Sequence, residues 1–544
     1  MTYFNNLPLE VVLRILEFCS LADLANLTRL SRSWHDFIDG SRQEIIYQSR
    51  VDRPPGASDL SFLEDSATFE RYYEGIATFK KLCRRQTLLL RNWNSSRPLT
   101  KEFLYRIVGY DKALSLWHLD LKRRFIISFS TGDKPSLELN ERLNVTDIDT
   151  QELLWSDAIR CTRYCKKFKY RDGIAVFPPI VNDGSLLEVW KTDNSQARGV
   201  FRKFGDLVHD CDVDGIDLGP DHVCTVSRDG WGFVWDVNGE LPQLVTRMSI
   251  KQSEPWGLSQ DEDVVMYSMY EKGYHILDKT TGALLGEINP GKCQRSYAID
   301  APELDTAATM TAKYTRAEYN GMMFFPPGKA TSDRSTPLKL KGPVWTDDWT
   351  ESEIESGERT DGYGPQHECT TGILSGSLMV GLCGGEEDGP DRLIIYPDWK
   401  KGFSTPGHFE DNAYIIRLGG AYQRIDCSRQ VSVHGNRIML RAQQCIYIIS
   451  LNEDGTAPEE GQELPIGPSF CFYAGYWSTW VGQMQLFDDC AAMDYWVCTT
   501  ALALSHFIRP IHTDCYSRCR SKASKKSLTF GPLPSLILPI GCQI

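Results

Sequence analysis

The side chains best suited to chemistry are scattered along this chain rather than grouped into a catalytic motif. No G-x-S-x-G, H-E-x-x-H or phosphate-binding P-loop pattern stands out, and the ten histidines do not cluster with cysteines or carboxylates at metal-ligand spacing. Cys161 and Cys165 have no second cysteine pair at a zinc-like distance, and His367-Glu368-Cys369 is an isolated tripeptide. We therefore expect no metal, no cofactor and no catalytic residue.

The composition is that of a soluble globular protein with an excess of acid. The net charge is −13, which argues against nucleic acid and anionic membrane surfaces as partners because both attract concentrated Lys and Arg. No signal peptide is visible, and no run approaches the roughly 18 to 20 apolar residues of a membrane span. The 17 cysteines, without a secretory signal, indicate reduced thiols, so we expect a cytoplasmic and/or nuclear protein.

The first clear pattern from the N-terminus is a short helical stretch, Leu7 to Ile38. Pro8 suits the first turn of a helix, and Ser20 with Asp23 resembles a capping box that begins a second helix. The stretch is too short to bury its own core, since chains below roughly 40 residues usually need staples or partners. It is either the first hairpin of an all-helical domain or a module whose apolar surface is completed by another protein.

The same stretch resembles an F-box domain. The matching features, in the family's order, are the Leu7-Pro8 opening, Glu10, Ile15-Leu16 with Phe18, Leu21, Asp23-Leu24 and Arg32-Ser33-Trp34. The chain departs from the family at Leu30-Ser31, where Val-Cys is usual, but this change keeps an apolar residue beside a small one.

The resemblance implies that this stretch docks onto a Skp-family adaptor. The candidates for the adaptor interface and for the packing behind it are Leu7, Pro8, Ile15, Leu16, Leu21, Leu24, Leu27 and Trp34. On this basis we expect an F-box over residues 1–45 and a helical linker over residues 46–100. After a turn at residues 53–56, apolar spacing predicts helix over residues 59–93, similar to the linker helix between an F-box and a WD-repeat propeller.

Beyond Pro98 the pattern changes from helical to strand-like. Short β-branched and aromatic runs, such as RFIISFS and CIYIISLNEDG, are separated by Gly, Asp, Asn and Pro. Strands of about five residues without alternating helices favour a closed all-β architecture. A pair of β-sandwiches is the alternative.

One segment, residues 209–240, resembles a WD repeat. In such repeats a turn aspartate bonds a histidine, the histidine bonds a hydroxyl residue, and the hydroxyl bonds a tryptophan of the third strand. The resemblance assigns these structural roles to Asp229, His209, Ser227 and Trp235. Such a network satisfies buried polar groups and locks a four-stranded sheet. A sandwich pair would not explain this signature.

The repeat predicts a WD-repeat-like β-propeller over residues 101–498. This length suits seven blades of about 40 to 45 residues, with six or eight as alternatives. An insertion is expected at residues 326–365, where an acidic run would either steer basic partners or simply be solvated. Residues 499–544 are basic, lack a strand rhythm, and are expected to form a poorly ordered tail.

The expected fold is a small all-α F-box plus helical linker, followed by an all-β propeller. This combination is typical of the substrate-recognition subunit of an SCF-type cullin–RING ubiquitin ligase, which supplies proximity rather than catalysis. The F-box would bind the Skp-family adaptor, and the propeller would bind a protein substrate that the sequence does not identify. The alternatives are a WD-repeat scaffold whose helical N-terminus packs on its own propeller, and a propeller enzyme. Because the other repeats are degenerate, no substrate-binding residue can be named.

Overall fold

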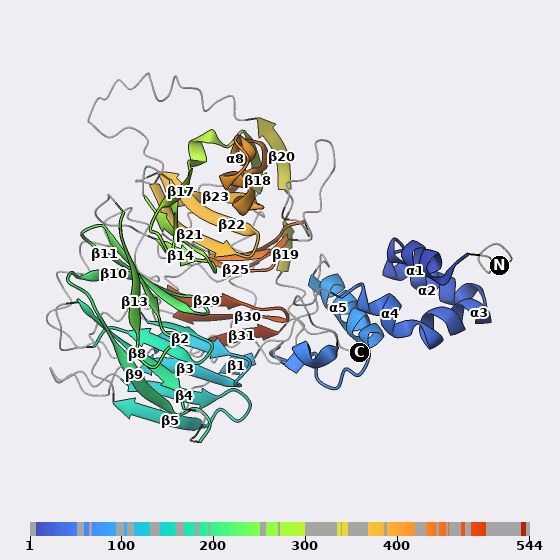
Figure 1. Cartoon of the computed structure of the whole chain (residues 1–544), viewed down its shortest axis with the longest axis horizontal. Helices are drawn as coiled ribbons and strands as arrows, with labels where there is room; N and C mark the ends of the chain where they lie inside the picture. Colours follow the sequence, from blue (N-terminus) through green and yellow to red (C-terminus); the bar gives the residue numbers. More distant parts are fainter. Residues whose placement is uncertain are drawn as a thin grey trace, which may run out of the picture.

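A helical arm extends from a large body of β-sheets in the computed structural model of this chain (Figure 1). The residues that the structure describes are 7–51, 59–64, 68–93, 103–105, 114–130, 142–158, 168–179, 184–193, 195, 197–250, 257–269, 273–299, 335–338, 340–345, 368–385, 389–418, 431–441, 445–452, 455, 469–473, 480–496 and 535–539.

The helical arm comprises the described residues between 7 and 93. Its elements are α1 (Leu9–Glu17), α2 (Leu21–Leu30), α3 (Arg32–His35), the π-helix η2 (Asp36–Ser41), α4 (Gln43–Gln48), the 3₁₀ helix η3 (Leu60–Glu64) and α5 (Phe79–Trp93). The predicted capping box is confirmed: the Asp23 N–H donates to Ser20 Oγ at 3.1 Å, and the Ser20 N–H donates to the Asp23 carboxylate at 3.0 Å. These bonds satisfy two backbone donors and fix the start of α2.

One hydrophobic core joins the helices of the arm. Val12 and Leu16 of α1, Leu24 of α2 and Trp34 of α3 pack with Leu82 of α5. Among the described residues, no side chain from beyond α5 belongs to this core. The short N-terminal helices therefore obtain their missing core from the linker, which explains how so small a segment can be folded.

The linker is less helical than the sequence predicts. Residues 68–78 form turns, and helix resumes only at Phe79. Arg71 and Gly75 both adopt positive φ, which is incompatible with a continuous right-handed helix. The helical spacing of the apolar residues was misleading here because Phe69 packs against the β-sheet body instead of the arm.

The β-sheet body contains seven sheets among the described residues. The first sheet contains β2 (Leu114–Asp120), β3 (Phe125–Ser130), β4 (Arg142–Asp147) and β5 (Leu153–Ala158). The second contains β6 (Lys169–Arg171), β7 (Ile174–Phe177), β8 (Leu186–Thr192) and β9 (Phe201–Val208), and the third contains β10 (Val213–Leu218), β11 (His222–Ser227), β12 (Trp231–Asp236) and β13 (Gln243–Ser249). The fourth contains β14 (Leu258–Gln260), β15 (Val264–Ser268), β16 (Tyr274–Asp278) and β17 (Leu284–Ile288). Each of these is an antiparallel meander in chain order.

The remaining three sheets combine strands from distant parts of the chain. In spatial order, the fifth sheet contains β21 (Glu368–Ser375), β22 (Leu378–Gly385), β23 (Gly389–Pro397), β24 (Tyr414–Leu418), β18 (Arg295–Ile299) and β20 (Leu340–Trp345). The sixth contains β25 (Val431–His434), β26 (Arg437–Arg441), β27 (Cys445–Ser450), β28 (Ser469–Tyr473) and β19 (Ser335–Leu338). The seventh contains β29 (Trp480–Leu486), β30 (Cys490–Trp496), β31 (Ser535–Pro539) and β1 (Phe103–Tyr105). Three short helices, η4 (Pro290–Lys292), η7 (Trp399–Phe403) and α8 (His408–Asn412), connect strands of this region.

The seven sheets form a closed ring. Their innermost strands are β2, β6, β10, β14, β21, β25 and β29, and each contacts the innermost strand of the next sheet until β29 meets β2. Apolar clusters lie between consecutive sheets, for example Val145 with Phe177 and Leu187 with Val223. This arrangement confirms the predicted all-β propeller, and the sheet number lies within the predicted range of six to eight.

The ring closes by pairing strands from opposite ends of the propeller. β1 runs antiparallel to β31, with Phe103 opposite Ile537, and β31 also pairs with β30. Ser535–Pro539 therefore differs from the expected tail, because the short apolar run SLILP supplies a strand of the last sheet. The other residues of that tail lie outside the described residues, as does the acidic run of the predicted insertion. That insertion does contribute β19 and β20.

Within the described part of the chain, no helix is both long enough and apolar enough to cross a membrane.

Candidate docking surface

Helix α1 carries apolar side chains on two different faces. One face packs into the arm core through Val12 and Leu16, which are 7% and 2% exposed. The other face carries Val11 and Ile15, four residues apart on the helix, and the exposed Leu7 and Phe18 extend this row just before and just after the helix. We call this row the α1 stripe.

The α1 stripe is open to solvent although it is entirely apolar. Val11 is 42% exposed, and Phe18, just after the helix ends, is 79% exposed. Figure 1 shows α1, α2 and α3 at the end of the arm farthest from the β-sheets, so the propeller does not cover the stripe. Scattered exposed apolar residues are ordinary, but a contiguous apolar row is typical of an interaction site.

The predicted adaptor-binding residues fall into two groups in the structure. Leu7, Pro8 and Ile15 are exposed at the α1 stripe or directly beside it. Leu16, Leu24 and Trp34 are buried in the arm core, while Leu21 and Leu27 are half-buried at its edge. The first group can contact another protein directly, the buried residues can only position the first group, and the two half-buried leucines keep part of their surface accessible.

Sequence reasoning did not include Val11 and Phe18 among the site residues. The signal was present, because apolar residues on more than one face of a short helix cannot all be buried in one core. The spacing alone does not show which face points inward. That choice is made by α4 and α5, which pack against the Val12 side of α1 through Ile46, Tyr47 and Leu82.

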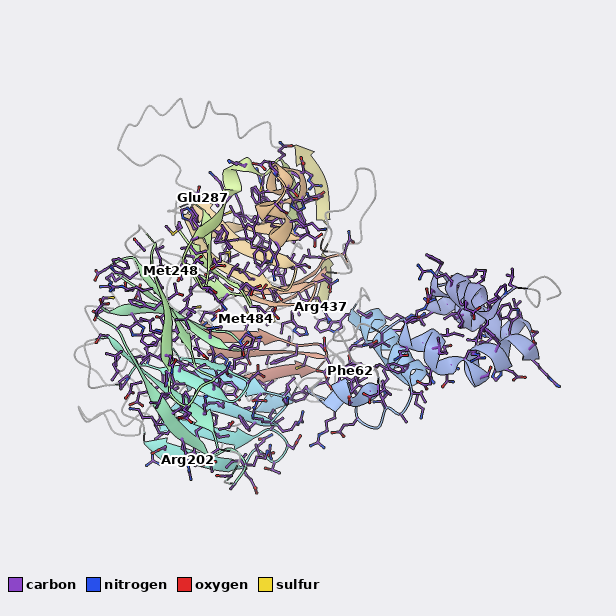
Figure 2. All side chains as sticks on the ribbon, in the orientation of Figure 1. Phe62, Arg202, Met248, Glu287, Arg437 and Met484 are labelled. Carbon is purple, nitrogen blue, oxygen red and sulfur yellow. The ribbon has the colours of Figure 1, made fainter. Side chains whose placement is uncertain are left out.

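The arm is fastened to the propeller at the turn between β29 and β30. The Asp489 carboxylate accepts hydrogen bonds from the N–H groups of Phe69 and Glu70, both at 2.9 Å. Trp93, the last residue of α5, donates its indole N–H to the Asp488 carbonyl at 2.7 Å. Arg437 lies over the Trp93 ring at 4.3 Å, and Figure 2 shows it on the side of the propeller that faces the arm.

A second set of contacts lies on the first propeller sheet. The Arg124 guanidinium donates to the carbonyl of Phe69 at 2.8 Å and pairs with Asp149 at 2.5 Å. Asp149 also pairs with Arg71 at 2.8 Å. The hydrogen bond from Arg124 is the main reason that the pKa of Asp149 is lowered. Ion pairs and hydrogen bonds to two different sheets hold the arm in a defined position.

The WD-type network differs from its predicted form at three points, since Trp235 bonds the histidine directly, the hydroxyl is a different residue, and the turn aspartate takes no part. His209 accepts from Trp235 Nε1 at 3.2 Å, and its partner hydroxyl is Thr225, at 2.9 Å, rather than Ser227. Ser227 accepts from the N–H of Trp231 instead, at 3.0 Å. Among the described residues, no hydrogen bond joins Asp229 to His209. Thr225 and Ser227 are two residues apart and therefore lie on the same face of β11, so the strand pattern alone allows either hydroxyl to bond the histidine. The position of the His209 ring selects Thr225.

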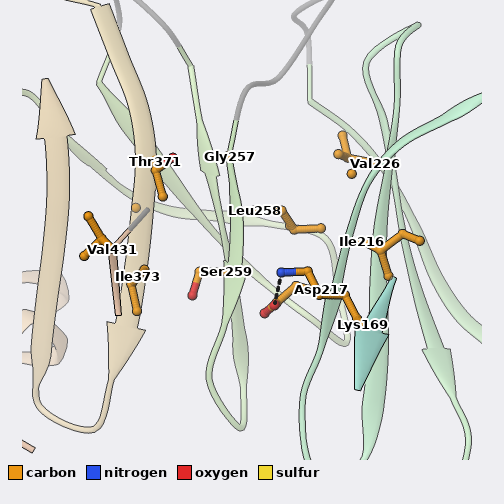
Figure 3. Close-up of a pocket in the computed structure, with 12 residues that line it drawn as sticks. Lys169, Ile216, Asp217, Val226, Gly257, Leu258, Ser259, Thr371, Ile373 and Val431 are labelled. Atoms are coloured by element: carbon orange, nitrogen blue, oxygen red, sulfur yellow. Dashed lines mark ion pairs between the residues drawn. The ribbon is translucent and has the colours of Figure 1, made fainter. Parts of the chain in front are cut away.

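A small cavity of about 230 Å³ opens on the innermost strands of the propeller (Figure 3). Lys169 and Asp217 form an ion pair across it at 4.0 Å, beside Ser259 and Thr371. Burial raises the pKa of Asp217. In the described part of the chain, no three His, Cys, Asp or Glu side chains are placed to hold a metal ion. This lining can hold a small polar group, but it shows no paired nucleophile and base.

Comparisons with known proteins agree with the sequence resemblance at the N-terminus. Residues 4–44 match the family model of the F-box domain. No curated protein matches the chain. Among solved structures, the chain is similar to the β-propeller domain of Myceliophteria thermophila Cps50 (Swd1), at 8% identity and a TM-score of 0.39, covering 73% of this chain and 99% of that one. It is also similar to the computationally designed protein Ika8, at 11% identity and a TM-score of 0.34, covering 72% of this chain and 98% of that one.

Proposed function

We propose that this chain, which joins an F-box domain to a β-propeller, is the substrate-recognition subunit of an SCF-type cullin–RING ubiquitin ligase. The observation that carries the proposal is the uncovered α1 stripe, which lies within the residues that match the F-box family. In this role the stripe binds a Skp-family adaptor, and the propeller binds a protein that is to be ubiquitinated. The chain acts in the cytoplasm and/or the nucleus.

The physical contribution of such a subunit is proximity. A substrate held on the propeller reacts as part of one complex, so the encounter between substrate and ligase becomes effectively intramolecular. No catalytic group is required in this chain. The defined attachment of the arm through Asp489 and Arg124 supports this role, because a fixed geometry keeps the effective concentration high.

The α1 stripe has enough apolar surface to support stable docking. Fully burying one Leu, Ile, Val or Phe side chain stabilises a complex by roughly 1.5 to 3 kcal/mol. The four side chains of the stripe are already partly covered, so each contributes less, and association entropy opposes binding by several kcal/mol. The stripe therefore acts as the anchor of a larger interface.

The test uses two adjacent valines of α1, of which Val11 is exposed and Val12 is buried in the arm core. Val11→Asp places a charge on the stripe, and we expect it to abolish co-purification of the Skp-family adaptor without lowering the melting temperature of the arm. Val12→Asp, the matched control, places the same charge in the arm core and should unfold the arm, since an unpaired buried charge is strongly destabilising. Full adaptor binding by Val11→Asp would refute the proposal.

The same experiment separates this role from a WD-repeat scaffold. A scaffold predicts no adaptor binding by any form of the chain, and a helical N-terminus that needs its own propeller for stability. The self-contained arm core favours the ligase subunit, because no described propeller side chain takes part in it.

A further inference from the structure

Arg50, which follows helix α4, reaches across to the end of helix α1. Its guanidinium donates a hydrogen bond through Nη2 to the carbonyl of Leu16 in the last turn of α1. The last carbonyls of a helix lack their usual partners within the helix and carry partial negative charge, so a cation placed there stabilises the helix end. Arg50 therefore acts as a cap at the C-terminus of α1.

The position of Arg50 is itself fixed by the arm. Its own N–H donates to the carbonyl of Tyr47 at 3.1 Å, and the next residue, Val51, is buried in the arm core. Among the described residues, no carboxylate pairs with Arg50, and its buried Nε has no acceptor. Burying an unsatisfied N–H is costly, so the bond to Leu16 is the interaction that explains an arginine at this position.

Phe18, at one end of the α1 stripe, depends on the last turn of α1 for its position. Its N–H donates to the carbonyl of Ile15 at 3.2 Å. The Arg14 guanidinium lies 5.4 Å from the centre of the Phe18 ring and pairs with Glu17 at 2.5 Å. All these contacts come from the end of α1, and the ring is not part of the arm core. If this turn frays, Phe18 is no longer held in line with Val11 and Ile15.

We propose that Arg50 is a positioning residue of the docking surface, which caps α1 so that Phe18 stays in line with the rest of the α1 stripe before the adaptor binds. The inference rests on the proposed function and adds to it a residue outside residues 4–44, which match the F-box family model. The physical gain is preorganisation, because a helix end that is already ordered does not have to be ordered on the adaptor.

The test measures the affinity of the full-length chain for an immobilised Skp-family adaptor by biolayer interferometry. Arg50→Ala removes the cap, and Arg50→Lys keeps the positive charge. The matched control is Arg91→Ala, which removes the same side chain from an exposed position of α5. We expect Arg50→Ala to weaken binding about five- to thirtyfold, Arg50→Lys to recover part of this loss, and Arg91→Ala to bind like the unmodified chain.

Double-mutant cycles separate positioning from a general loss of stability. In a chain that already carries Phe18→Ala, Arg50→Ala should cost little further affinity, because no ring is left to position. In a chain that carries Leu7→Ala, at the other end of the stripe, Arg50→Ala should have its full effect. An arm that is merely less stable would bind more weakly by the same factor in both backgrounds.

Hydrogen–deuterium exchange of the chain alone reports on the end of α1 without any adaptor. Residues 16–20 should exchange faster in Arg50→Ala than in the unmodified chain, because the turn that they form loses its cap. The first turn of α2 is the internal reference. There the Leu24 N–H donates to the Ser20 carbonyl at 2.9 Å, and its exchange should be unchanged.

The outcomes separate this inference from the proposed function. An unmodified chain that does not bind the adaptor overturns both. An unmodified chain that binds, with an Arg50→Ala variant that binds equally well, overturns the inference alone. Equal weakening in the two double-mutant backgrounds also overturns it, as does unchanged exchange of residues 16–20.

Discussion

The imidazole of His209 shows how a single tautomer can organise a propeller sheet. Its Nδ1 faces the Ser185 carbonyl at 3.0 Å, and since a carbonyl only accepts, Nδ1 carries the proton. Nε2 is therefore bare and accepts from both Trp235 and Thr225. Burial lowers the pKa of His209, and a second proton on Nε2 would oppose the indole N–H of Trp235, which can only donate.

His118 has a similar role where the ring closes. Its Nδ1 accepts from the Gln485 amide at 2.8 Å, and Gln485 also accepts from the N–H of Leu119, so one side chain joins the last sheet to the first. Burial lowers the pKa of His118 to about 3. The closure of the ring therefore depends on a neutral histidine.

At the residue scale we predict acid sensitivity that depends on His118. The pKa of His118 in the folded state is below the unfolded value of about 6.5. The stabilisation that comes from the neutral histidine is therefore fully present above about pH 6.5 and is lost as the pH falls toward 3. His118 alone contributes at most about 1.4 kcal/mol per pH unit to the slope of the free energy of unfolding against pH.

Urea denaturation near neutral pH and at mildly acidic pH measures this effect. His118→Gln should be less stable near neutral pH but should show a shallower loss of stability on acidification. An unchanged slope in His118→Gln would mean that this histidine is already protonated in the folded state.

Residue types and their spacing predict much of the docking surface, but they do not predict which face of α1 points outward. Pro8, the Ser20–Asp23 cap and the buried roles of Leu24 and Trp34 follow from local rules that act within a few residues. The choice of Thr225 over Ser227 depends on where a loop places His209, and local patterns do not encode that position.

At the scale of elements, α2 depends on its N-terminal cap. The Ser20 hydroxyl accepts from the Asp23 N–H, and the hydrogen bonds from Ser20 are the main cause of the lowered pKa of Asp23. We predict that Ser20→Ala lowers the stability of the arm by about 0.5 to 2 kcal/mol. Thermal unfolding measures the change, and Ser33→Ala, at an exposed position of α3, is the control. Equal melting temperatures for the two variants would contradict a structural role for the cap.

The elements themselves were only partly predictable from sequence. Strands such as β11 and β12 are evident from β-branched and aromatic runs between turn residues. Residues 68–78 are not helical because Phe69 and Arg71 make contacts with the propeller, and such long-range contacts override helical spacing. The sequence pattern does not predict β31, because the short run SLILP follows a basic segment in which no other strand-like runs are separated by turn residues.

At the scale of the whole molecule, Asp489 couples the arm to the propeller. Its carboxylate is 1% exposed, and burial raises its pKa. We predict that Asp489→Ala removes the acceptor of the Phe69 and Glu70 N–H groups, at a cost of about 1 to 3 kcal/mol for each hydrogen bond lost.

Small-angle scattering should then show a wider range of arm orientations for Asp489→Ala. Adaptor capture should be unchanged because the α1 stripe lies at the other end of the arm. Arg202→Ala, which removes an ion pair to Asp193 on an outer strand, is the control. An identical scattering profile for Asp489→Ala and the unmodified chain would show that the other contacts suffice.

The pairing of β1 with β31 has a consequence for synthesis of the protein. The arm leaves the ribosome several hundred residues before Ser535–Pro539, an interval on the order of tens of seconds at typical elongation rates. The arm can therefore fold and expose its α1 stripe while the propeller still lacks its closing strand. A product truncated before Ser535 would retain the docking end without a closed ring, and it would compete with the intact protein for the proposed adaptor.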